Sequence, residues 1–396
     1  MRPSVLRLAL ALPAALFTLS ACATVQPADC TSGDVRLTQE FSNAPDYACR
    51  RTGPASFELT VLPESPDINP SPWYAFDLEA ERDTEVSVAL DYGDYRHRYR
   101  PKIENSNGMW VAFPDSAVTL SNDGHSATLH VSLEAGRYRV AAQEVIGLDE
   151  REAWRGDFAA QHALAIETIG HSIDGRAIEA LSRRSPSPDA PLIIIVGGQH
   201  PPEVTGVLGL RAFLDTLFAE PSASEVFDRF EWLIVPDLNP DGVAEGHWRE
   251  NLGDTDLNRD WGPFRQPEIA AIRDAIAARA GEGHTPFLLL DFHSTRRDVL
   301  YTPHDNAGLT PANFSADWIA LLNEAWTGEG EAFERDPSHN PGLPTAKSWF
   351  ALTYNAPALT VEFGDETDRN RIADLSSAGA VALHRYLAGI RAGQVD

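Results

Sequence analysis

Residues 192–196, Leu-Ile-Ile-Ile-Val, constrain the fold more than any other stretch of this chain. A short, continuous apolar run that ends at two glycines is typical of a strand buried on both faces of a parallel sheet. Residues 205–219, which follow it, have the apolar spacing of a helix. A buried strand followed by a helix is the repeating unit of an α/β domain, so this region predicts a mainly parallel sheet flanked by helices.

The same alternation of strands and helices continues toward the end of the chain. Strand patterns occur at 230–235, 286–295 and 356–366, and helix patterns at 267–280 and 376–390. Residues 147–160 are predicted to be a linker. The predicted α/β domain, a mixed but mainly parallel sheet flanked by helices, therefore occupies residues 151–396.

The preceding part of the chain has a different periodicity. Residues 51–150 contain at least five short segments that alternate apolar and polar residues, separated by Gly, Pro, Asn and Asp. This pattern predicts a small antiparallel β-sandwich domain. Residues 22–50, rich in Pro, Ala, Ser and Asp, are predicted to be a tether and cap.

The N-terminus has the features of an export signal. Arg2 and Arg7 flank the start of a short apolar run, which is followed by Leu-Ser-Ala-Cys at 19–22. This tetrapeptide resembles a bacterial lipobox, so residues 1–21 are predicted to be a signal peptide and Cys22 the lipidated first residue. An ordinary signal peptide cleaved nearby is the alternative. The mature protein is expected to be exported and lipid-anchored to a bacterial membrane, facing the periplasm or the cell surface.

Charge and cysteine content limit the partners and the compartment. The formal net charge is −26, which argues against binding to nucleic acid or to an anionic membrane surface. Membrane contact is therefore expected only through the N-terminal lipid anchor. After removal of the signal peptide, Cys30 and Cys49 remain, and an exported pair can form a disulfide. Two free thiols are the alternative.

Residues that can bind a metal follow three of the predicted strands. His200 and Glu203 follow the first, His293 ends another, and Glu362 lies on the last. Because the carboxyl ends of parallel strands form one edge of the sheet, we expect these groups to meet there. Two imidazoles and a carboxylate with one open position form a catalytic zinc site, and a further carboxylate can take a proton from metal-bound water. Taken singly, each residue is equally consistent with a structural hydrogen bond or salt bridge.

A second group of polar residues lies at 239–261, which begins with a predicted turn, Asn-Pro-Asp-Gly. Arg249, Asn258 and Arg259 in this stretch suit recognition of an anion, because a guanidinium matches a carboxylate with two parallel hydrogen bonds.

The ordered set of HxxE, NPDG, WR, DxNR, a strand ending in His-Ser and a late strand carrying Glu resembles the zinc carboxypeptidases over residues 165–390. Residues 69–76 and 98–110 resemble the N-terminal sandwich domain of the cytosolic carboxypeptidase branch. The resemblance implies that His200, Glu203 and His293 bind one Zn²⁺ per chain. It also implies that the chain hydrolyses the C-terminal bond of peptides or proteins.

The resemblance assigns further roles. Glu362 would be general base and then general acid, and Arg249 would polarise the scissile carbonyl and hold the oxyanion. Asn258 and Arg259 would grip the terminal carboxylate of the substrate, and Asp256 would orient His200 by accepting its hydrogen bond.

Two positions bear on specificity and on a departure from the family. Counting back from Glu362 at the family spacing places Lys347 in the wall of the specificity pocket, which favours an acidic C-terminal residue. A surface lysine paired with local acids is the alternative. The mobile tyrosine of pancreatic-type enzymes has no counterpart, because its position falls near Asn340.

Two other functions stay open. Succinylglutamate desuccinylase and aspartoacylase, which deacylate N-acyl amino acids, resemble the pattern too, but the His-Trp-Arg-Glu-Asn stretch and the preceding sandwich favour a peptidase. The other alternative is a carbohydrate- or peptide-binding lipoprotein on an inactive peptidase scaffold, which the presence of every expected catalytic group opposes.

Overall fold

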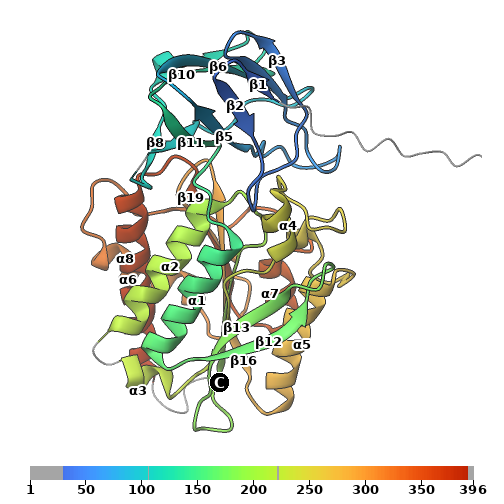
Figure 1. The fold of residues 1–396 in the computed structure, drawn as a ribbon. Helices are drawn as coiled ribbons and strands as arrows, with labels where there is room; N and C mark the ends of the chain where they lie inside the picture. Colours follow the sequence, from blue (N-terminus) through green and yellow to red (C-terminus); the bar gives the residue numbers. More distant parts are fainter. Residues whose placement is uncertain (1–29, 106, 221–222, 391–396) are drawn as a thin grey trace, which may run out of the picture.

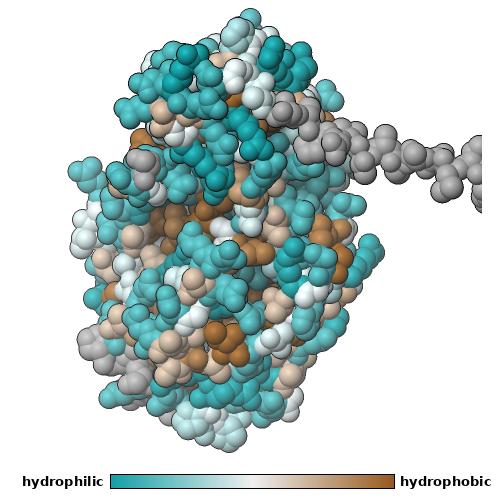
Figure 2. Space-filling model, in the orientation of Figure 1, coloured by the Kyte–Doolittle hydropathy of each residue, from teal (hydrophilic) through white to brown (hydrophobic). Residues whose placement is uncertain are grey.

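The computed structural model describes residues 30–105, 107–220 and 223–390, so the predicted signal peptide and Cys22 lie outside the described residues. A β-sandwich lies at the top of Figure 1 and a larger α/β domain lies below it. The face drawn in Figure 2 is mostly hydrophilic.

The sandwich consists of two sheets. The first is antiparallel throughout, in the order β1 (Thr31–Ser32), β2 (Val35–Thr38), β5 (Ala75–Ala80), β11 (Gly136–Ala141), β7 (Lys102–Glu104), β8 (Trp110–Ala112). The second has the order β3 (Cys49–Gly53), β4 (Ser56–Thr60), β6 (Thr84–Asp91), β10 (Ser126–Leu133), β9 (Val118–Leu120). A short 3₁₀ turn, Asp115–Ala117, precedes β9. Only β4 and β6 pair in parallel here, so the predicted antiparallel sandwich has one parallel pair.

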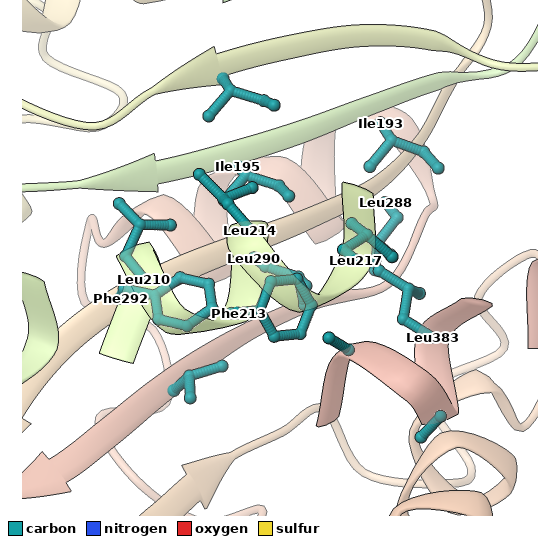
Figure 3. Close-up of a cluster of buried hydrophobic side chains, with 14 of the residues drawn as sticks. Ile193, Ile195, Leu210, Phe213, Leu214, Leu217, Leu288, Leu290, Phe292 and Leu383 are labelled. Atoms are coloured by element: carbon teal, nitrogen blue, oxygen red, sulfur yellow. The ribbon is translucent and has the colours of Figure 1, made fainter. Parts of the chain in front are cut away.

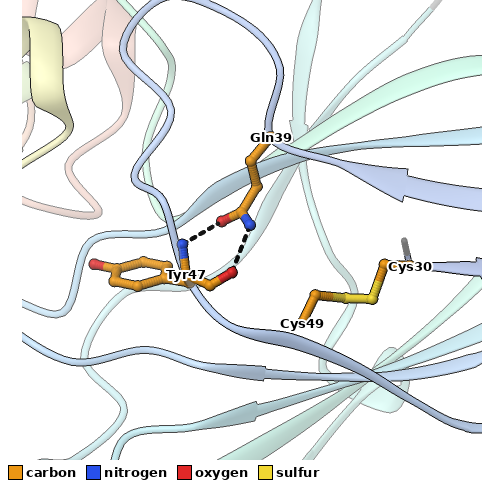
Figure 4. The surroundings of a disulfide bond; sticks show 4 residues. All are labelled: Cys30, Gln39, Tyr47 and Cys49. Carbon is orange, nitrogen blue, oxygen red and sulfur yellow. Dashed lines mark hydrogen bonds between the residues drawn. A yellow bond between two sulfur atoms is a disulfide. The ribbon is translucent and has the colours of Figure 1, made fainter. Parts of the chain in front are cut away.

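The sandwich begins earlier than the predicted boundary at residue 51. Strands β1, β2 and β3 belong to its sheets, so the described part of the predicted tether is folded into the domain. A disulfide joins Cys30 to Cys49, and Gln39 and Tyr47 exchange two hydrogen bonds beside it (Figure 4). With a sequence separation of 19 between the cysteines, the crosslink is worth about 3 kcal/mol by loss of chain entropy in the unfolded state.

The α/β domain is built on an eight-stranded mixed sheet. Its order is β12 (Ala165–His171), β13 (Ala177–Arg183), β15 (Glu231–Val235), β14 (Leu192–Gly197), β16 (Pro286–Thr295), β19 (Ala358–Gly364), β17 (Val299–Tyr301), β18 (Glu334–Asp336). The four central strands, β15, β14, β16 and β19, are parallel to one another, and antiparallel pairings occur on both sides of them. The predicted mainly parallel sheet is therefore confirmed.

Helices cover both faces of this sheet (Figure 1). One face packs against α1 (Leu148–His162), α2 (Val204–Ala219), α6 (Phe314–Ala325) and α8 (Arg369–Gly389), and the other packs against α5 (Pro267–Gly281) and α7 (Ala346–Tyr354). Strand β14 contributes Ile193 and Ile195 to the first core and Ile194 to the second, which explains its unbroken apolar run (Figure 3). The short helix α3 (Ala223–Phe227) follows α2.

Two local predictions were wrong. The predicted linker is helix α1, whose few buried side chains, among them Phe158, leave little apolar periodicity to read. The predicted Asn-Pro-Asp-Gly turn instead begins helix α4 (Pro240–Glu245), because the Asn239 side chain accepts a hydrogen bond from the Gly242 amide and Pro240 occupies the first turn. No helix in the described part of the chain is both long and apolar enough to cross a membrane.

Candidate metal centre

The first predicted ligands lie on the turn between β14 and α2. Gly198 has a φ of +66°, and a side chain there would meet the Pro236 carbonyl oxygen at 2.9 Å, so only glycine fits this turn. The turn carries His200 and leads to Glu203, the residue before α2. Both side chains are therefore presented at the carboxyl end of the central strand.

Three potential metal ligands converge there. His200 Nδ1 lies 2.9 Å from Glu203 Oε1, and His293 Nδ1 lies 2.7 Å from Glu203 Oε2. The ligand atoms of the three residues all lie within 4.8 Å of one another, and all three residues are buried. Thus the structure brings together the two imidazoles and the carboxylate that the sequence predicted as ligands.

The contacts of the Nε2 atoms of His200 and His293 show that these two histidines and Glu203 fit a zinc ion. His200 Nε2 lies 2.8 Å from Asp256 Oδ1, and His293 Nε2 lies 2.9 Å from Asp291 Oδ2. A carboxylate at Nε2 favours the proton on that nitrogen and leaves the Nδ1 lone pair for a metal, which is the usual support for zinc-binding histidines. Two neutral imidazoles and one carboxylate are also a donor set that zinc prefers.

The electrostatics of the centre favour a cation. Burial raises the pKa of Glu203, but the adjacent imidazoles outweigh burial and hold that pKa well below its usual value. Burial lowers the pKa of His293, but Asp291 and Glu203 outweigh it and raise that pKa well above the usual value. This concentration of buried carboxylates stabilises positive charge at the centre.

Glu362 lies next to this centre on β19, in register with His293 on β16. Its Oε2 is buried and finds no hydrogen-bond partner among the described residues. Burial, and then repulsion by Glu203, raise the pKa of Glu362 to about 8. A buried carboxylate with an unused oxygen beside a metal site can exchange protons with a bound water or substrate.

Asp256 connects the metal centre to Arg249. Its Oδ1 faces His200, and its Oδ2 accepts a hydrogen bond of 2.7 Å from Arg249 Nε. Arg249 Nη1 lies 3.6 Å from Glu203 Oε1, so the guanidinium borders the metal centre and lines the same cavity. The predicted contact of Asp256 with His200 is therefore present, and the same carboxylate also holds Arg249.

A cavity of about 240 Å³ opens over the centre. Arg259 lines it with a side chain that is 32% exposed, and its Nη1 donates to the Asn258 carbonyl at 2.8 Å and lies 4.0 Å from Asp256 Oδ2. The Asn258 amide oxygen accepts from the Ala346 backbone at 2.9 Å, which ties it to the start of α7. Arg259 is therefore more available to an incoming anion than Asn258.

Lys347 lines another part of the cavity and is only 8% exposed. Its Nζ donates to the His339 carbonyl at 3.2 Å, and it forms no ion pair within 4 Å among the described residues, although Asp336 acts on its charge from farther away. Burial lowers the pKa of Lys347 to about 8. It is therefore not the surface lysine paired with local acids that the sequence left as an alternative.

Several residues of the site were missed by sequence reasoning. Asp291 could have been found, because it stands two residues before His293 and so lies on the same face of β16. His339 and Tyr301, whose rings stack 3.7 Å apart, and the sandwich residues Asn69 and Arg98 also line the cavity. Tyr301 ends β17, whereas the other three come from loops, two of them in the sandwich domain, and no local pattern marks them.

The three potential ligands form a candidate metal centre at the carboxyl edge of a mixed sheet. Residues 152–328 match the model of the zinc carboxypeptidase family, so the chain contains a zinc carboxypeptidase domain. It is 34% identical over 150 residues to cytosolic carboxypeptidase 2 of Xenopus tropicalis, covering 36% of this chain. It is 28% identical over 138 residues to cytosolic carboxypeptidase 6 of Mus musculus, covering 32% of this chain. The chain spans 16% and 26% of the lengths of these two relatives.

The fold extends the likeness beyond the matched region. A metallo-carboxypeptidase from Burkholderia cenocepacia superposes with a TM-score of 0.74 at 19% identity, and the alignment covers 89% of this chain and 99% of that one. This likeness includes the sandwich as well as the α/β domain. The comparisons do not favour the alternative of an N-acyl amino acid deacylase.

Proposed function

We propose that this protein is a zinc metallocarboxypeptidase that removes the C-terminal residue of peptides or proteins. The observation that supports this most is the unpartnered oxygen of Glu362 beside His200, Glu203 and His293 in one cavity. The match to the zinc carboxypeptidase model supports the reaction class.

The protein residues have separable tasks in this reaction. Zinc, if held by His200, Glu203 and His293, would polarise the scissile carbonyl and make water more acidic. Glu362 would accept a proton from the attacking water and deliver it to the leaving amine. Arg249, fixed by Asp256, stabilises the negative charge that develops on the carbonyl oxygen.

Arg259 gives the reaction its exopeptidase character. Its partly exposed guanidinium lines the cavity that contains the metal ligands and can bind the terminal carboxylate of a substrate with two hydrogen bonds. A peptide amidated at its C-terminus lacks that carboxylate. It should be cleaved far more slowly than the matched free acid, whereas an endopeptidase would cleave both.

We also propose a preference for acidic C-terminal residues. The buried ammonium of Lys347 has no carboxylate within ion-pair distance among the described residues, and a Glu or Asp side chain in the cavity would supply one. Matched peptides ending in Glu, Leu and Lys, digested with the zinc-loaded protein and read by the mass of the released residue, test this. Equal release from all three would refute the preference but leave the carboxypeptidase activity standing.

Export and lipid anchoring are a separate proposal. Residues 1–22 have the features of a lipoprotein signal, and the Cys30–Cys49 disulfide suits an oxidising compartment. Mass analysis of the membrane-bound protein from a bacterial host should show a lipid-modified Cys22 as the first residue. A Cys22→Ser variant that stays in the membrane fraction with the same N-terminus would contradict lipidation.

A further inference from the structure

One carboxylate of the sandwich domain contacts the segment that carries Arg249. Glu64, in the loop between β4 and β5, accepts three hydrogen bonds from consecutive backbone amides of the α/β domain. These come from Trp248 at 2.9 Å, Arg249 at 2.8 Å and Glu250 at 2.6 Å. One oxygen accepts from Trp248 and the other accepts from Arg249 and Glu250, so both oxygens are used.

The same short segment is anchored in the sandwich by its tryptophan. The Trp248 side chain is fully buried and belongs to the sandwich core rather than to either core of the α/β domain. Its Nε1 donates to the Tyr47 hydroxyl at 2.6 Å, and the Tyr95 ring lies edge-on at 5.2 Å. The backbone of this segment is therefore held from the sandwich, while the next side chain, Arg249, reaches back to Asp256.

We propose that Glu64 is a positioning residue for Arg249, and that the sandwich domain is thereby part of the active site. Hydrogen bonds from amides to a carboxylate are charge-assisted and stronger than those between neutral groups. Three of them on consecutive residues hold the backbone from which Arg249 extends. Displacement of this guanidinium by a fraction of an ångström would weaken its contact with the developing oxyanion.

Other contacts already hold the two domains together. Arg98 pairs with Asp365 at 3.0 Å, and Arg369 pairs with Glu144 at 2.7 Å. Both pairs involve the segment that follows β19, through Asp365 and Arg369, and not residues 248–250. Loss of the Glu64 carboxylate should therefore alter the Arg249 segment without separating the domains. Glu144→Gln is a matched control, because it also removes one interface carboxylate.

A double-mutant cycle tests the proposal, which rests on the proposed peptidase activity. Glu64→Gln keeps the size of the side chain but turns an N–H₂ group toward one of the backbone donors. We expect kcat to fall about tenfold with KM nearly unchanged, since Arg249 acts mainly in the transition state. In an Arg249→Ala background the same change should cost less than about twofold. Equal losses in both backgrounds, or an equal loss in Glu144→Gln, would show a general structural effect and overturn the proposal.

Amide hydrogen exchange gives a readout that does not need activity. In Glu64→Gln, the amides of residues 248–250 should lose protection relative to the unmodified protein, and in Glu144→Gln they should not. Unchanged protection in Glu64→Gln would overturn the positioning role. Absence of peptidase activity in the unmodified protein would instead refute the proposed function, and the exchange result would still decide whether Glu64 holds this segment.

Discussion

Replacement of Asp256 by Asn separates the two tasks of this carboxylate. Asp256 Oδ1 accepts from His200 Nε2 at 2.8 Å and from the backbone N–H of Asn258 at 2.8 Å. Its Oδ2 accepts from Arg249 Nε at 2.7 Å. An asparagine has one acceptor oxygen, which will occupy the position that faces two donors. The amide N–H₂ group then points at the Arg249 guanidinium, where both groups are donors.

The magnitude follows from the bond that is lost. A hydrogen bond between a carboxylate and a charged donor contributes about 1.5–3 kcal/mol. Since about 1.4 kcal/mol corresponds to a factor of ten in rate, kcat should fall about 10- to 150-fold. Because the amide oxygen still accepts from His200, zinc affinity should change less than about tenfold.

The assay combines steady-state kinetics at saturating zinc with a zinc-chelator competition. Asp291→Ala is the comparison, because it removes the carboxylate that contacts His293 and leaves the Asp256–Arg249 contact in place, and it should lower zinc affinity about 10- to 100-fold. The reasoning is refuted if Asp256→Asn loses zinc as strongly as Asp291→Ala but keeps full kcat once saturated.

The pKa of Lys347 is about 8, so its positive charge is present below that pH and is lost above it. The ratio of kcat/KM for C-terminal Glu over Leu should fall as pH rises through about 8, and a ratio that falls equally in Lys347→Met would exclude this lysine as the cause. Burial and the repulsion of Glu64 raise the pKa of Glu250 to about 7. Its charge therefore costs stability as pH rises from about 4.5 to 7, and Glu250→Gln should stabilise the metal-free protein by on the order of 1 kcal/mol at pH 8 and not at pH 4.5, measured by urea unfolding. Replacement of Cys30 and Cys49 by Ser should lower the free energy of unfolding by about 3 kcal/mol, and an unchanged denaturation midpoint would show that the crosslink adds no stability.

The sequence predicted the parts of the fold that depend on local periodicity. The run at 192–196 became a strand with apolar residues on both faces, because Ile193 and Ile194 enter different cores. The convergence of His200, Glu203, His293 and Glu362 followed from their places at the ends of parallel strands, since parallel topology brings such ends to one edge.

The remaining features depend on contacts between distant parts of the chain. Glu64 is 184 residues from Trp248 in sequence, and its loop has no periodicity that would indicate a partner. Arg98 enters the cavity only because the sandwich packs against the carboxyl edge of the sheet. Helix α1 was missed for a different reason, since few of its residues are buried and its sequence carries little hydrophobic signal.

The central claim is that His200, Glu203 and His293 hold a catalytic zinc ion on which Glu362 acts as the base. Zinc content and peptide hydrolysis, measured together for the unmodified protein and for Glu362→Gln, test it most directly. We expect one zinc per chain in both proteins and a loss of about 10²- to 10⁴-fold in kcat for the variant. A protein that hydrolyses peptides without zinc, or a variant with unchanged hydrolysis, would contradict the claim.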